Sequence, residues 1–197
     1  MGSLSHLKSQ FFADNIKTDF TKEPEYGIVP LEMDNNMSDL VLAEAMKYGE
    51  EIKANTNLPT DARKVQAWRL NQKDSDTAEI IQHSVIELNQ VYNYRLAGIQ
   101  DIQYLEYHAE DNAKYDWHID ASSGLSSMRK ISISWVLNDG FKGGDLTFFG
   151  DGGEEVIYNS TPSKLVSFTS WLNHKVSPVE KGIRKVLVVW VWGDAWR

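Results

Sequence analysis

From Gly98 onward, the chain alternates between apolar and polar residues in short runs. Successive side chains of a β-strand point to opposite faces, so a period of two predicts strands that bury one face. Such runs cover residues 102–107, 131–137, 146–149, 164–168 and 184–192. The stretches between them are rich in glycine, asparagine and aspartate, which is typical of turns. This half of the chain is therefore predicted to form many short strands.

The first hundred residues are predicted to be mostly helical, with short strands at residues 29–33 and 68–70. The clearest apolar series at helical spacing is Ile81, Val85, Leu88 and Tyr92. It follows Asp76 and Glu79, whose spacing matches a capping box with Asp76 as the N-cap residue. Another helix is predicted from Ser38, with its end within residues 55–59. Helices followed by many short strands predict an α+β protein, in which a barrel-like double sheet of the jelly-roll type is braced by the helices.

Length and composition limit the class of protein further. A chain of 197 residues can form one well-buried domain, and a second would be cramped. The absence of cysteine excludes disulfides, thiolate metal sites and cysteine nucleophiles, and together with a start unlike a secretion signal it favours a cytoplasmic location. No apolar run approaches the roughly 18 residues of a membrane span. The formal net charge of −8 argues against a nucleic-acid partner, which would need a basic face.

Three candidate metal ligands and one cation stand out in the β-rich half. His118 and Asp120 are two residues apart, so at a strand end both side chains project to the same face. His174 and Arg184 follow further along. Two neutral imidazoles and one carboxylate cover one face of an octahedral ion and leave the other positions open, as in non-heme Fe(II) oxygenases. A guanidinium beside such an ion could hold an organic acid through two hydrogen bonds.

A histidine and an aspartate at this spacing are a weak signal alone, and the stronger signal is an ordered set of segments. The set consists of Tyr107, residues 115–120, 129–132, 137–139, 143–146, 174–179 and 182–184, and Trp190. In this set the chain resembles the Fe(II)- and 2-oxoglutarate-dependent dioxygenases, in their prolyl-4-hydroxylase-like branch, over about residues 103–196. The resemblance implies one dioxygenase domain over residues 1–197, with a double-stranded β-helix core of the jelly-roll or cupin-like type. Residues 1–100 would be a mostly helical support region and residues 101–197 the catalytic β-core.

The resemblance also implies roles for individual residues. His118, Asp120 and His174 would bind Fe(II), and Arg184 would pair with the distal carboxylate of 2-oxoglutarate. Tyr107 matches a family tyrosine that often hydrogen-bonds this co-substrate. O2 is the other co-substrate, and ascorbate is a further candidate cofactor. The remaining histidines, His6, His83 and His108, are not expected to bind the metal.

Strand alternation adds detail to the expected pocket. If Arg184 faces the interior of the barrel, then Val186, Val188 and Trp190 face it too, and Trp190 would form a wall of the iron pocket.

On the run at residues 131–137, we predict that Ser132 and Ser134 face inward and bind the co-substrate, because hydroxyls near a bound dicarboxylate find partners there. The alternative has these serines facing solvent and Trp135 facing the core. Many relatives carry a tyrosine where this chain has Val136, so the hold on the distal carboxylate would rest heavily on Arg184.

The leading functional interpretation is an oxygenase that couples decarboxylation of 2-oxoglutarate, to succinate and CO2, to hydroxylation of a substrate C–H bond. The favoured substrate is a prolyl residue in a peptide or protein, packed against Tyr115, Trp117 and Trp190. One alternative is hydroxylation of a free amino acid or another small metabolite.

An alternative of another class is a non-catalytic, metal-binding cupin-like module. Arg184 argues against that module, because a structural metal site needs no clamp for a carboxylate. Asp120 disfavours a halogenase, in which a small residue stands at this position so that halide can bind iron. The net charge makes a nucleic-acid demethylase the weakest candidate.

Overall fold

The computed structural model describes residues 27–52, 63–73, 75–150 and 152–195. The strands are β1 (Ile28–Glu32), β2 (Glu50–Ile52), β3 (Gln66–Arg69), β4 (Leu96–His108), β5 (Tyr115–His118), β6 (Arg129–Val136), β7 (Lys142–Gly143), β8 (Leu146–Phe149), β9 (Glu155–Tyr158), β10 (Lys164–Thr169), β11 (His174–Val176), β12 (Val179–Lys181) and β13 (Ile183–Gly193). The helices are α2 (Asn35–Tyr48) and α3 (Asp76–Tyr92), and the 3-10 turns are η2 (Ala109–Asp111) and η3 (Gly124–Met128).

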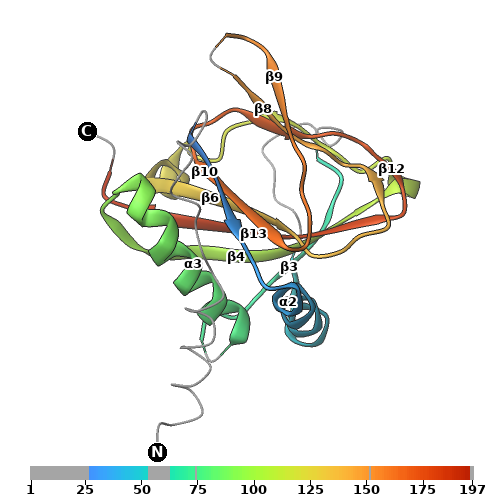
Figure 1. Cartoon of the computed structure of the whole chain (residues 1–197), viewed down its shortest axis with the longest axis horizontal. Helices are drawn as coiled ribbons and strands as arrows, with labels where there is room; N and C mark the ends of the chain where they lie inside the picture. Colours follow the sequence, from blue (N-terminus) through green and yellow to red (C-terminus); the bar gives the residue numbers. More distant parts are fainter. Residues whose placement is uncertain (1–26, 53–62, 74, 151, 196–197) are drawn as a thin grey trace, which may run out of the picture.

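Two antiparallel sheets form the centre of the molecule. The larger has seven strands in the order β1-β10-β6-β13-β4-β3-β2, and the smaller has four in the order β5-β11-β8-β9. Figure 1 shows the smaller sheet on one side of the larger sheet and the helices α2 and α3 on the other. The predicted α+β class, with a double-stranded β-helix core braced by helices, is confirmed.

The first hundred residues supply strands as well as helices. β1, β2 and β3 all belong to the seven-stranded sheet, and the predicted boundary at residue 100 falls inside β4. The pairing of β1 with β10 at one edge and of β3 with β4 near the other joins this region to the core. The helical support region of the sequence prediction therefore also widens the sheet.

The helix ends differ from the predicted ones. Ser75, not Asp76, is the N-cap of α3, because its hydroxyl accepts a hydrogen bond from the backbone N–H of Ala78 at 3.0 Å. The helix predicted from Ser38 begins earlier, and it ends at Tyr48. A strand, β2, follows almost at once, and the predicted helix end at residues 55–59 lies outside the described residues.

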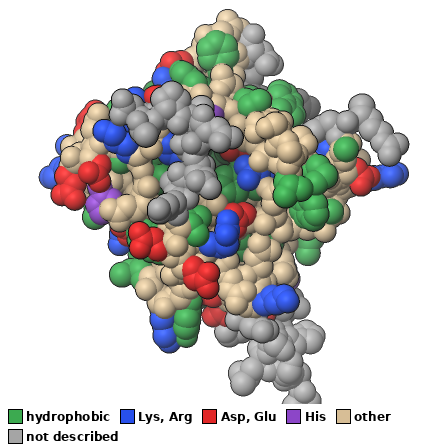
Figure 2. Space-filling view, turned by 180° about the vertical axis from the view of Figure 1, so that it is seen from behind, with side chains coloured by type: hydrophobic (Ala, Val, Ile, Leu, Met, Phe, Trp, Pro, Cys, Tyr) green, Lys and Arg blue, Asp and Glu red, His purple; other side chains and the backbone are tan. Residues whose placement is uncertain are grey.

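The surface carries charges of both signs. On the face shown in Figure 2, Lys and Arg side chains are interspersed with Asp and Glu side chains among the described residues. The full sequence carries a formal net charge of −8. Among the described residues, no helix has both the length and the apolar character that crossing a bilayer requires.

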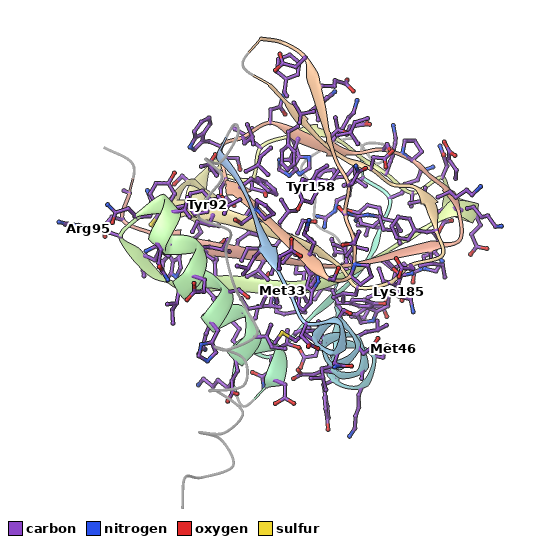
Figure 3. The ribbon with its side chains drawn as sticks, viewed as in Figure 1. Met33, Met46, Tyr92, Arg95, Tyr158 and Lys185 are labelled. Carbon is purple, nitrogen blue, oxygen red and sulfur yellow. The ribbon has the colours of Figure 1, made fainter. Side chains whose placement is uncertain are left out.

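Two apolar cores lie on opposite sides of the large sheet. On β13, Leu187 and Val189 face the helices, whereas Val186 packs between the two sheets. Figure 3 shows Met33, of the helix-side core, and Tyr158, which packs against the core between the sheets, on different sides of β1 and β10. The helix-side core makes the large sheet a rigid platform, and the space between the sheets is left for the site.

We expect the helix-side core to account for much of the stability. Leu88 of α3 is fully buried, and Leu88→Ala should lower the free energy of unfolding by about 2–5 kcal/mol through lost burial and a cavity. On the same helix Ile86 is 61% exposed, so Ile86→Ala should change it by only about 0.5 kcal/mol or less. Urea denaturation of both variants measures the difference, and equal losses would contradict the assignment of α3 as a packed brace.

Candidate metal centre and adjoining pocket

His118, Asp120 and His174 converge at one end of the smaller sheet. His118 is the last residue of β5, Asp120 follows two residues later, and His174 is the first residue of β11 and pairs directly with His118. Nε2 of His118 lies 3.8 Å from Oδ1 of Asp120, and Nε2 of His174 lies 3.7 Å from Oδ2. One ligand atom from each residue can be chosen so that all lie within 4.8 Å of one another, which allows one ion to be bound by the three. Within the described residues, no other His, Asp or Glu group has this geometry.

Backbone carbonyls orient both imidazoles. Nδ1 of His118 lies 2.7 Å from the carbonyl oxygen of Asp116, and Nδ1 of His174 lies 2.9 Å from that of Leu172. A carbonyl oxygen can only accept, so each Nδ1 carries the proton and donates. Each Nε2 then presents its lone pair toward Asp120, which is the tautomer that a metal ligand needs.

Burial and the neighbouring groups together determine the protonation states of His118 and Asp120. Desolvation, with the neighbouring His174, lowers the pKa of His118 to about 4, so this imidazole is neutral at physiological pH. Burial alone would raise the pKa of Asp120, but His174, His118 and the hydroxyl of Ser132 together hold it below its usual value. A neutral imidazole and an ionised carboxylate are the forms that bind a divalent cation.

Ser132 supports the carboxylate from the opposite sheet. Its hydroxyl donates to Oδ2 of Asp120 at 2.7 Å and lies 3.0 Å from the hydroxyl of Ser170. The backbone N–H of Asp120 donates to the carbonyl of Ser170 at 3.0 Å. The predicted inward orientation of Ser132 is therefore seen in the structure, where its hydroxyl contacts Asp120 and Ser170.

A β-bulge in β5 places Tyr115 and His118 on one face. Across the β5–β11 pair, His174 and Val176 are two residues apart, whereas their partners His118 and Tyr115 are three apart. The extra residue interrupts the alternation, so the Tyr115 ring stacks on the His118 ring at 3.5 Å between centroids and 16° between planes.

Trp117, the neighbour of His118 in β5, faces away from the pocket. Trp117 makes an edge contact with Phe149, with centroids 5.8 Å apart, and its ring lies 4.5 Å from Nζ of Lys175. Tyr115 and Trp190 line the pocket beside the metal ligands, but Trp117 does not. Of the three aromatic residues predicted to contact the substrate, the structure therefore brings two together, and the bulge is what places Tyr115 on the His118 face.

Arg184 closes the far end of this pocket. It is 1% exposed, and its guanidinium carbon lies 5.4 Å from the centre of the Tyr107 ring, which also lines the pocket. As predicted from alternation, Val186, Val188 and Trp190 line the same cavity. Gly144 makes room for the arginine, because a Cβ there would lie 2.8 Å from Cδ of Arg184. A larger residue than glycine at position 144 would therefore collide with the Arg184 side chain.

The guanidinium of Arg184 fits a carboxylate ligand. Its Nε and Nη2 atoms are buried and have no hydrogen-bond partner, which is costly for a charged group. Burial lowers the pKa of Arg184, and Tyr107 and Asp145 act in the opposite direction. Two adjacent N–H groups of a planar guanidinium match the two oxygens of a carboxylate, so the orphaned donors are those expected for a bound organic acid.

Ser134 and Trp135 lie on opposite faces of β6. Ser134 lines the cavity, whereas Trp135 is fully buried on the helix side, where its indole N–H donates to the carbonyl of Pro162 at 2.8 Å. Val136 is buried but does not line the pocket. The inward prediction for the serine face is thus seen for both Ser132 and Ser134.

Arg63 is a pocket residue that the sequence did not reveal. It lies just before β3, and its backbone forms an isolated antiparallel bridge with Tyr115. That bridge brings its side chain into the cavity that holds His118 and Arg184. No motif surrounds Arg63, and the signal that would have found it is the strand pairing, which a single sequence does not show.

Comparison with protein families agrees with this geometry. Residues 102–192 match the model of the 2OG-Fe(II) oxygenase superfamily. This segment of the chain is therefore similar to that superfamily. The matched segment runs from β4 to β13 and contains every candidate ligand of the metal and of the acid, but not Arg63. The superfamily uses Fe(II), 2-oxoglutarate and O2, and the cluster of two histidines and one aspartate fits Fe(II). No curated protein sequence matches the chain.

Solved structures of oxygenases share the fold. A prolyl-4-hydroxylase from Pseudomonas putida superposes with a TM-score of 0.70 at 20% identity, over 86% of this chain and 94% of that one. A prolyl hydroxylase from Trichoplax adhaerens, in complex with a peptide fragment of the hypoxia inducible factor oxygen degradation domain, gives 0.69 at 15% identity, over 98% and 94%. The epimerase SnoN of nogalamycin biosynthesis gives 0.65 at 12% identity, over 95% and 82%. At these identities the likeness establishes the fold.

Removal of one candidate ligand should abolish metal binding. His174→Ala should strongly weaken binding of Fe(II), measured anaerobically by calorimetry. The loss should exceed the roughly 10–100-fold that is typical when a residue hydrogen-bonded to a metal ligand is replaced. His83→Ala and His108→Ala should bind normally, because neither residue belongs to the cluster. Circular dichroism should show that all three variants remain folded. If His174→Ala retains near-normal affinity, the ligand assignment is wrong.

Proposed function

We propose that the chain is an Fe(II)- and 2-oxoglutarate-dependent hydroxylase that acts on a prolyl residue in a peptide or protein. One observation carries the proposal. The three-residue ligand cluster and the buried Arg184, with two orphaned N–H donors, line one cavity between the sheets. A non-catalytic metal site would have no use for an unpaired buried cation, which lowers stability unless a ligand satisfies it.

In this proposal, residues 1–197 form one dioxygenase domain, and each pocket residue has a defined task. His118, Asp120 and His174 hold Fe(II), and Ser132 keeps the Asp120 carboxylate in place by its hydrogen bond. Arg184 binds the distal carboxylate of 2-oxoglutarate. When bound, Fe(II), 2-oxoglutarate and O2 supply the oxidation of a C–H bond, with release of succinate and CO2.

The remaining residues bind the co-substrate or exclude water. Tyr107 is paired with Arg184, and Ser134 is paired with Val188 further along the same strand; both hydroxyl groups line the cavity and can donate to bound 2-oxoglutarate. Burial raises the pKa of Tyr107, so its hydroxyl stays protonated and able to donate. The apolar side chains Val186 and Val188 keep the cavity dry, which strengthens the charge pair at Arg184.

A prolyl substrate is supported by two aromatic walls and by the structural relatives. Tyr115 and Trp190 line the cavity, and flat aromatic faces pack well against a pyrrolidine ring. Two of the similar structures are prolyl hydroxylases, and one of them holds a peptide. A free amino acid or another small metabolite is the second candidate substrate, since the same fold also serves SnoN, an epimerase of nogalamycin biosynthesis.

Replacement of Arg184 should separate binding from stability. Arg184→Met should weaken binding of 2-oxoglutarate on the order of a hundredfold, because two charge-assisted hydrogen bonds are lost. The ligand-free variant should be at least as stable as the wild type to urea, because an unpaired buried charge is replaced by an apolar chain of similar length.

Arg184→Lys should restore only part of the affinity, since an ammonium group cannot reproduce the fork. Arg69→Gln is the matched control, because Arg69 is exposed and pairs with Asp101 away from the pocket. Calorimetric titration of the Fe(II)-loaded protein under anaerobic conditions measures the affinity. Unchanged 2-oxoglutarate binding in Arg184→Met would refute the role of Arg184.

The substrate class is tested by product analysis. Purified enzyme with Fe(II), 2-oxoglutarate, O2 and ascorbate should release succinate in the presence of prolyl peptides, and mass spectrometry should find one added oxygen on proline. The same reaction with peptides in which alanine replaces proline is the control and should give no added oxygen. Succinate release stimulated by free amino acids and by no peptide would show that the substrate is a small metabolite.

A further inference from the structure

We infer that Arg63 is a specificity-determining residue that binds a carboxylate of the primary substrate, so that the enzyme prefers an acid whose carboxylate lies near the oxidised C–H bond. The inference rests on the proposed function, because it places a second acid beside the one held by Arg184. The substrate class is therefore an acid, either a free amino acid or peptide C-terminus, or a peptide with an acidic side chain next to the target residue.

The position of Arg63 is fixed by its contact with Tyr115. Its guanidinium carbon lies 4.8 Å from the centre of the Tyr115 ring, a cation–π distance. The Tyr115 ring in turn stacks on the imidazole of the candidate ligand His118. The backbone bridge between Arg63 and Tyr115, and the hydrogen bond from the N–H of Lys64 to the carbonyl of Lys114 at 3.2 Å, anchor this part of the chain. Arg63 is thus held one aromatic ring away from the metal ligand.

The guanidinium of Arg63 has unused binding capacity. Its Nε atom is buried and has no hydrogen-bond partner. Among the residues that the structure describes, no carboxylate lies at ion-pair distance from it, whereas Arg69, six positions on, is paired with Asp101 at 2.9 Å. Its positive charge acts to lower the pKa values of Tyr107, Tyr115 and His118, so its field reaches across the cavity. An unpaired donor and an uncompensated charge both call for an anion.

A count of charges shows that this anion is additional to 2-oxoglutarate. The two positive charges of Fe(II) and the one of Arg184 are offset by the single charge of Asp120 and the two of 2-oxoglutarate. Arg63 remains as an excess positive charge in the cavity. Arg129 lies outside the cavity lining, over the Trp190 ring at 4.1 Å, and is therefore left out of this count. A substrate carboxylate would restore neutrality.

Burial places Arg63 on the side from which the substrate arrives. Arg184 is 1% exposed, whereas Arg63 and Tyr115 are partly exposed. A co-substrate held by Arg184 would occupy the buried part of the lining, which leaves the partly exposed side chains of Arg63 and Tyr115 for the primary substrate. The planar fork of a guanidinium matches a carboxylate in two hydrogen bonds, and Arg63 can make them to a substrate whose ring rests on Tyr115.

The experiment compares acid and neutral forms of the same probe. The probes are N-acetylproline against N-acetylprolinamide, acetyl-Pro-Glu-amide against acetyl-Pro-Gln-amide, and N-acetylvaline against N-acetylvalinamide. Binding to the protein loaded with Fe(II) and 2-oxoglutarate is measured by calorimetry without oxygen, so that no turnover is needed. The proteins are the wild type, Arg63→Gln, Arg63→Lys and the control Lys64→Gln, which removes the same charge from the neighbouring exposed residue.

The wild type and Lys64→Gln should bind the acid of at least one pair about 10–100-fold more tightly than its neutral form. Arg63→Gln should abolish this preference and leave 2-oxoglutarate affinity unchanged, and Arg63→Lys should retain part of it. A preference confined to the Pro-Glu pair assigns the carboxylate to a side chain, and a preference for N-acetylproline assigns it to a chain end. Both outcomes support the inference.

Two results would overturn the inference. One is a wild type that binds each acid no better than its neutral form. The other is Arg63→Gln with 2-oxoglutarate binding as weak as that of Arg184→Met, which would make Arg63 a co-substrate residue. Failure of the proposed function would give a different result. The protein would then still bind acids more tightly than their neutral forms through Arg63, N-acetylvaline included, but no prolyl probe would gain oxygen when air is admitted.

Discussion

The hydrogen bond from Ser132 to the carboxylate of Asp120 joins the two sheets at the point where the metal would bind. Ser132 lies on β6 in the middle of the large sheet, and Asp120 follows β5 at the edge of the small one. The bond fixes Oδ2 of Asp120, which in turn faces the Nε2 atom of His174 at 3.7 Å. A buried carboxylate without such donors would tend to take up a proton. This hydroxyl group therefore ties the ligand carboxylate to the large sheet and helps the two histidines to keep it ionised.

The helix-side core makes this arrangement durable. Ile133 and Trp135, which flank Ser134 on β6, are fully buried on the opposite face of the sheet, against the helices. Because apolar packing holds that face, the inner face can carry hydroxyls, an arginine and the ligand cluster without loss of the fold. On β6 this arrangement follows from strand alternation, because Ser132 and Ser134 on the inner face are flanked by Ile131, Ile133 and Trp135 on the outer face.

Strand alternation is also why so much could be predicted from the sequence. It correctly grouped Arg184 with Val186, Val188 and Trp190, and it placed Ser132 and Ser134 inside. Sequence reasoning was limited where the backbone departs from regular geometry. A single extra residue in β5 brings Tyr115 onto the face of His118 and leaves Trp117 on the other face, and a bulge leaves no mark in a hydrophobic pattern.

Long-range pairing was the other limit. Arg63 enters the cavity only because its backbone meets Tyr115, and no local pattern encodes a contact between such distant positions. The N-cap of α3 shows the same limit at short range, since Ser75 and Asp76 are both good caps and geometry chooses between them. Residue types therefore predicted the chemistry of the site, whereas the full set of residues that line it depended on the fold.

The two pocket arginines differ in what they reveal about binding order. Arg184 is deeply buried, so its orphaned N–H donors can be satisfied only by a ligand that enters before the mouth is filled. Arg63 stands nearer the mouth, on the tyrosine that stacks against His118. A second acid bound there would cover the first and exclude water from the metal ligands. The burial of the two cations thus predicts an ordered reaction, in which the co-substrate binds first and the substrate acid closes the cavity.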